Sequence, residues 1–97
     1  MNRPEDIRSI AEHYGLVKQS TKAIEEMAEL TKAICKIREN PALDSRNEQY
    51  MNDVVEEIAD VCIMAEQLRY LYGEHEVDKM IDFKLDRQLE RICMGRD

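Results

Sequence analysis

Helix-breaking residues are rare in this chain, and their positions restrict what it can fold into. Three glycines and two prolines occur in 97 residues, and the apolar residues between them repeat with the period of a helix. Glycine and proline end helices more readily than other residues do. The pattern therefore predicts four helices, over residues 3–14, 16–39, 45–72 and 76–94.

Local signals indicate where these helices begin and end. Asn2 is suited to cap the first helix, and Gly15 is suited to end it. A loop containing a proline is expected over 40–44. The four residues Ser45–Glu48 have the spacing of a capping box, which predicts a helix start there, and Gly73 predicts its end.

The composition predicts an all-α fold with a single domain over residues 1–97. Hydrophobic residues make up 43% of the chain and charged residues 36%, whereas aromatic residues make up only 5%, fewer than sandwiches and barrels usually need. Short connections favour antiparallel neighbours, so we expect an antiparallel helical bundle of about four helices. A domain of this size buries only roughly 60–70% of its unfolded surface, so we expect homo-oligomerisation to complete the core.

Charge and cysteine content narrow the possible partners and compartment. The net charge of −7 argues against binding to nucleic acid polymers, which needs a basic surface. A nucleotide substrate is still compatible with it, because a bound cation reverses the local charge. No apolar run approaches the ~18 residues of a membrane span. Cys35, Cys62 and Cys93 are interpreted as small buried hydrophobic residues in a reducing compartment, so a cytoplasmic location is expected.

Two pairs of carboxylates suggest a metal site. Glu26 and Glu29 stand three residues apart, and so do Glu57 and Asp60; residues at this spacing share one helix surface. If their two helices are antiparallel neighbours, four carboxylates can meet at one place. Clusters of oxygen ligands suit Mg²⁺ or Mn²⁺, and these ions suit phosphate chemistry.

The apolar pattern places these carboxylates at the margin of the expected core. The second helix has one apolar face, on whose edge Glu26 and Glu29 lie. The third helix has a main apolar stripe and a second stripe that contains Glu57 and Asp60. The apolar face of the second helix comprises Ala23, Met27, Leu30, Ile34 and Ile37. The main stripe of the third comprises Val54, Ile58, Val61, Ala65 and Leu68, and its second stripe continues through Met64 and Leu71.

Simpler interpretations of the charged residues are also possible. Acidic pairs occur by chance on solvated helices, where nearby Lys18, Lys22 and Lys32 would form ordinary ion pairs. Near the C-terminus, Lys84 and Arg87 share one row of the fourth helix with Arg91, and this row could reach a polyphosphate. It could equally complement the C-terminal end of that helix.

The acidic motifs resemble those of the MazG-like all-α nucleoside triphosphate pyrophosphohydrolases. The similarity covers the segment 19–30 with its E-x-x-E, the segment 56–61 with its E-x-x-D, and the basic pair at Lys84 and Arg87. The hallmark of that family is the same pair of acidic motifs, and the spacer here is 27 residues.

The resemblance implies an activity and a set of site residues. Members bind Mg²⁺ and cleave a nucleoside triphosphate between its α- and β-phosphates, which yields the monophosphate and pyrophosphate. They are homodimers or homotetramers. Carried over to this chain, the metal-binding and catalytic residues would be Glu26, Glu29, Glu57 and Asp60. The substrate-binding residues would be Gln19, Lys22, Lys84 and Arg87.

Other functions stay open on the sequence alone. Dimeric dUTPases and phosphoribosyl-ATP pyrophosphatases share the acidic pattern. A related protein that binds nucleotide without cleaving it would also retain it. A non-catalytic, oligomeric helical module that binds a protein partner would explain the amphipathic helices equally well.

Overall fold

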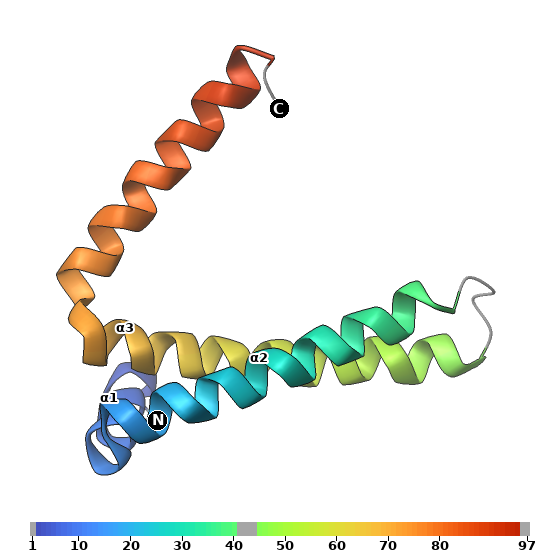
Figure 1. Cartoon of the computed structure of the whole chain (residues 1–97), viewed down its shortest axis with the longest axis horizontal. Coiled ribbons are helices and arrows are strands. Elements are labelled where there is room, and N and C mark those ends of the chain that lie inside the picture. Colours follow the sequence, from blue (N-terminus) through green and yellow to red (C-terminus); the bar gives the residue numbers. More distant parts are fainter. Residues whose placement is uncertain (1, 41–44, 96–97) are drawn as a thin grey trace.

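The computed structural model describes residues 2–40 and 45–95, and its secondary structure there is helical without strands. Three helices follow one another along the chain (Figure 1). They are α1 (Arg3–Tyr14), α2 (Leu16–Arg38) and α3 (Ser45–Cys93). The predicted all-α class is confirmed, whereas most of the expected loop over 40–44 lies outside the described residues.

The signals at the first helix act as predicted. The Asn2 side chain accepts a hydrogen bond of 3.2 Å from the backbone N–H of Glu5, which satisfies one of the free donors at the start of α1. Gly15 ends the helix at φ +86°, and its N–H donates to the carbonyl of Ala11 at 2.8 Å. The turn into α2 therefore uses a backbone conformation that glycine adopts easily.

The expected third and fourth helices form one element that bends at Gly73. This residue has φ 134° and ψ 95°, outside helical geometry, and helical structure resumes directly after it. We call residues 74–93 the arm. Together α2 and the part of α3 before Gly73 form an antiparallel pair, which we call the hairpin. The arm leads away from the hairpin (Figure 1).

Ion pairs hold the bend at Gly73. Arg69, one turn before it, donates two hydrogen bonds to the carboxylate of Asp78 in the arm, at 2.7 and 3.2 Å, and a third to Glu74 at 3.0 Å. From α1, Arg8 approaches Glu74 at 3.5 Å. Because a bidentate arginine–carboxylate pair fixes direction as well as distance, these contacts set the angle of the arm.

Small side chains bring the two helices of the hairpin together. Ala23 and Ala33 of α2 are buried, as is Met64 of α3, and α1 adds Ala11. Met64 lies on the stripe of α3 that carries the carboxylates, and at about 100° per residue Glu26 falls between Ala23 and Ala33 around α2. The helices therefore meet along the row in which Glu26, Glu57 and Asp60 stand.

This contact corrects the predicted core. Met27, Ile34 and Ile58 were expected at its centre, yet they are 49%, 42% and 45% exposed. The alanines at the contact belong to α2, where Ala23 and Ala33 allow α3 to approach more closely than Met27 and Ile34 would. The main apolar stripes are consequently left partly in solvent.

The cysteines and the hydropathy of the helices bear on two further expectations. The three cysteines are exposed, so their interpretation as buried residues is wrong for the single chain. None of the helices in the described part of the chain is long and apolar enough to cross a bilayer.

Candidate metal centre

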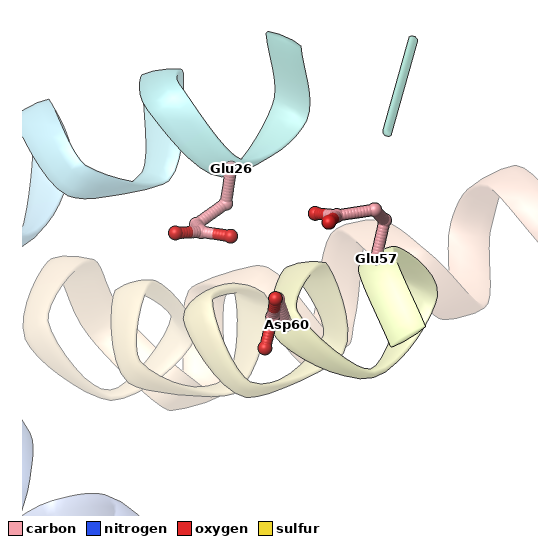
Figure 2. Close-up of side chains that lie close together, drawn as sticks. All are labelled: Glu26, Glu57 and Asp60. Atoms are coloured by element: carbon pink, nitrogen blue, oxygen red, sulfur yellow. The ribbon is translucent and has the colours of Figure 1, made fainter. Parts of the chain in front are cut away.

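Three of the four predicted carboxylates converge between α2 and α3. Glu26 comes from α2, and Glu57 and Asp60 come from successive turns of α3 (Figure 2). One oxygen of each lies within 4.8 Å of the oxygens of the other two. Such a group could hold a metal ion, although exposed acidic groups also occur without one.

Glu57 has the least favourable surroundings of these three carboxylates. Its Oε2 is enclosed by the protein and has no hydrogen-bond partner among the described residues. Burial raises the pKa of Glu57, and the negative charges of Asp60, Glu26, Glu29 and Glu56 raise it further. A carboxylate removed from water without a donor is unfavourable, so the pocket around Glu57 favours either a proton or a cation.

Lys22 partly compensates the negative charge from one side. Its ammonium lies 3.2 Å from Glu26 and 3.9 Å from Glu25 on the same helix. The hydrogen bond to Glu26 raises the pKa of Lys22, and the charges of both glutamates add to this effect. Glu26 is thus neutralised on one side, while no ammonium or guanidinium group of the described residues pairs with Glu57.

Glu29, the fourth predicted ligand, lies outside the group of three but next to it. It is exposed on α2. With Glu57 and Asp53 it lines a small hollow of about 140 Å³, to which Lys32 and Lys36 also contribute. Glu29 therefore stands beside Glu57 and one turn after Glu26 along α2, whereas Lys22 stands one turn before Glu26.

Gln19 has a structural partner that the sequence analysis missed. Its amide N–H donates to the side-chain carbonyl of Gln67 at 2.7 Å, and both residues are buried. Gln67 also points its amide toward the sulfur of Met64 at 3.7 Å. The spacing 57, 60, 64, 67 repeats every three or four residues, so extending the carboxylate stripe by one turn would have identified Gln67.

A second hollow, of about 530 Å³, opens beside Lys22. Tyr14 and Lys18 form one part of its lining, and the Lys18 ammonium lies 5.4 Å from the centre of the Tyr14 ring. Gln19, Lys22 and Met64 also line it. Thr21 and Glu25 complete the lining, so the hollow joins an aromatic face, a buried amide, two cations and one carboxylate next to the carboxylate cluster.

The two basic residues of the arm stand apart from this site. Lys84 and Arg87 are exposed, and the arm carries them away from the hairpin (Figure 1). The Arg87 guanidinium lies over the ring of Phe83 at 5.6 Å. Of the eight predicted site residues, six therefore lie in or beside the hairpin, and these two do not.

Comparisons of the chain with known protein families, with curated proteins and with solved structures find no match. What the site does must therefore be argued from its geometry and chemistry.

Proposed function

We propose that this protein is a Mg²⁺-dependent nucleotide pyrophosphohydrolase of the MazG-like type. It would cleave a nucleoside or deoxynucleoside triphosphate between the α- and β-phosphates to the monophosphate and pyrophosphate. The observation that carries the proposal is the meeting of Glu26, Glu57 and Asp60, with the enclosed Glu57 Oε2 lacking a donor.

The chemistry of the donor set fits a hard divalent cation. The group offers carboxylate oxygens and neither sulfur nor imidazole, which favours Mg²⁺ or Mn²⁺ over zinc. Glu26, Glu57 and Asp60 would hold the ion, and Glu29 stands close enough to Glu57 to influence its charge. When bound, such an ion neutralises the triphosphate and makes water a better nucleophile.

The neighbouring residues are suited to hold the substrate. Lys22 already lies at the edge of the cluster, where it can meet phosphate oxygens. The hollow lined by Tyr14 and Gln19 is adjacent, and from Glu26 to Gln19 the helix rises roughly 10 Å at 1.5 Å per residue. This separation suits a nucleotide with its phosphates at the carboxylates and its base against Tyr14.

The arm residues would reach the substrate only in an assembly. We propose a homodimer or homotetramer in which a helical bundle of about four helices is completed between copies. In that arrangement Lys84 and Arg87 of one copy would approach the phosphates held by another, where they would stabilise negative charge.

The direct test is hydrolysis. Each (d)NTP is incubated with the full chain and Mg²⁺, and pyrophosphate and monophosphate are measured by phosphorus NMR. We expect at least one nucleotide to give both products, and Glu57→Gln to abolish turnover. Glu56→Gln is the matched control, because Glu56 is exposed on the same helix. If no nucleotide yields pyrophosphate and no cation raises the melting temperature, the proposal fails.

Including dUTP and phosphoribosyl-ATP in the panel separates the related activities. Preference for either would favour the dUTPase or the phosphoribosyl-ATP pyrophosphatase alternative. Nucleotide binding without any product would indicate the non-cleaving alternative.

A non-catalytic helical interaction module is the second candidate, and the partly exposed apolar stripes favour it. Under this alternative the carboxylates have no ligand, so Glu26→Ala and Asp60→Ala leave the protein equally or more stable. Mg²⁺ then has no effect on melting, whereas a ligand that binds only the native state must raise the melting temperature.

A further inference from the structure

The single chain exposes more surface than its mass predicts. Its accessible surface is 7732 Å². Folded monomers of 11.4 kDa have about 5,800 Å² by the usual scaling, so about 1,900 Å² is in excess. Obligate homodimers bury roughly 1,000–2,500 Å² on each copy. The excess therefore has the size of one such interface.

The arm contributes one part of this surface. Residues 79–95 are all exposed. Four large apolar side chains follow one side of the helix at intervals of four, four and three residues, which is the spacing of a packing stripe. They are Ile81, Leu85, Leu89 and Ile92, between 45% and 64% exposed; we call them the arm stripe.

The hairpin contributes the other part. Five large apolar side chains on α2 and α3 are between 42% and 66% exposed: Ile24, Met27, Ile34, Met51 and Ile58. We call them the hairpin face. At about 100° per residue, Ser20 falls among the α2 members and Tyr72 lies on the side of α3 that includes Ile58. The Ser20 hydroxyl and the Tyr72 hydroxyl are hydrogen-bonded at 2.7 Å, so both rows lie on one side of the hairpin.

We infer that a second copy of this chain covers both surfaces, with the arm stripe of each copy packed on the hairpin face of the other. Pairing of two arms alone would leave the hairpin face in water, whereas the reciprocal contact covers both. Since Gly73 and the Arg69–Asp78 pair fix the angle of the arm, a two-fold related copy can reciprocate the contact. The inference does not depend on the proposed hydrolysis.

The test measures the mass of the full chain in solution by light scattering after gel filtration. The wild type is expected as a dimer or a multiple of it. The arm variant Ile81→Asn/Leu85→Asn and the face variant Ile24→Asn/Ile58→Asn should each be monomeric. The control Asp82→Asn/Asp86→Asn places the same side chains on the acidic side of the arm and should keep the wild-type mass.

Mixing the two monomeric variants identifies the pairing. A mixed dimer retains one intact contact, formed by the arm of the face variant and the face of the arm variant, so equimolar mixing should restore dimer. Circular dichroism checks that each variant keeps its helices. If a variant unfolds, the test uses amide hydrogen exchange of the wild-type arm in place of that variant. Slow exchange over residues 79–92 then supports the inference.

Three outcomes would overturn the inference. The first is a monomeric wild type at micromolar concentration with a rapidly exchanging arm. The second is a face variant that stays dimeric while the arm variant dissociates, which indicates pairing of arm with arm. The third is failure of the folded variants to recover any dimer on mixing.

Discussion

At the scale of single residues, the Glu57 side chain links the stability of the fold to pH. It stands in the contact between two helices, one of its oxygens is enclosed, and four further carboxylates act on it. A folded state that raises the pKa of an acidic side chain binds the proton of that side chain more tightly than the unfolded state does. Ionisation of Glu57 therefore lowers the stability of the metal-free protein as pH rises above its ordinary value of 4.5.

The first prediction concerns Glu57→Gln in the presence of a chelator. At pH 8 the variant should melt at a higher temperature than the wild type, because the amide keeps the shape and removes the charge. The advantage should shrink as pH falls toward 4.5, where both states of the wild type become protonated. Thermal scans across this pH range measure it. Glu56→Gln is the comparison variant and should give a smaller gain, because the charge of Glu56 is the weakest of the four that raise the pKa of Glu57.

The second prediction adds Mg²⁺ to the same scans. The wild type should gain stability with increasing Mg²⁺, and Glu57→Gln should gain little, so the order of the two melting temperatures reverses. Mg²⁺-dependent turnover should fall at least ~100-fold in the variant. Loss of a residue that only hydrogen-bonds a metal ligand already lowers metal affinity or activity by about 10–100-fold. Equal Mg²⁺ gains in both proteins would contradict the assignment of Glu57 as a ligand.

The third prediction concerns the buried amide pair. Gln67→Leu leaves the Gln19 amide enclosed without its partner, so it should lower the free energy of unfolding by about 1–3 kcal/mol. Gln19→Leu/Gln67→Leu should recover much of this loss, because replacing both partners removes the unsatisfied group. Urea unfolding of the single and double variants measures the coupling, and additive losses would contradict it.

Helical periodicity placed Glu57 and Asp60 on one face, and the expectation of antiparallel neighbouring helices brought Glu26 to them. The same periodicity did not separate Glu29 from them. Glu29 is displaced around α2 from the contact row, and only the actual line of contact between the helices shows this. Gln67 was not predicted because it lies two turns beyond the E-x-x-D motif, whereas Gln19 was expected only from the resemblance.

At the scale of the helices, short-range signals predicted the ends better than the faces. Asn2 and Gly15 act within one turn of the backbone, so the neighbouring sequence is enough to predict their effect. The packed side of α2 depends on its partner, because Ala23 and Ala33 allow close approach while Met27 and Ile34 offer more apolar area. The pattern of apolar residues within α2 does not show whether close approach or larger apolar area decides which side packs.

The bend in α3 allows a fourth prediction. Gly73 holds a backbone conformation that costs other residues of order 1–3 kcal/mol, while alanine favours a regular helix by about 1 kcal/mol over glycine. Gly73→Ala should therefore straighten α3 and increase the maximum dimension measured by X-ray scattering. Gly95→Ala, at φ +68° near the helix end, is the control, and an unchanged dimension for Gly73→Ala would contradict the prediction.

At the scale of the whole molecule, the chain resembles part of a bundle more than a finished one. Its buried apolar side chains are few and mostly small, being Ala11, Ala23, Ala33 and Met64 among the described residues. The expectation from size, that a partner subunit completes the core, is consistent with this surface. The sequence could not show which surfaces remain open, because that follows from which stripes the hairpin uses internally.

The fifth prediction follows from this incompleteness. If folding depends on a second copy, the melting temperature should rise with protein concentration, because association stabilises the native state by mass action. Scans over a hundredfold range of concentration, in chelator and without nucleotide, measure the effect independently of any catalysis. A constant melting temperature together with a monomeric mass would contradict it.

The position of the acidic row has a consequence for how the molecule responds to its surroundings. Three like charges face one another along the line where the two longest segments touch, so the fold is under internal repulsion at the place that supports everything else. We expect a cation bound along that line to tighten the contact between the two helices, and its removal to loosen it. Under the proposed function, the ionic content of the solution would therefore help to set how rigid this protein is.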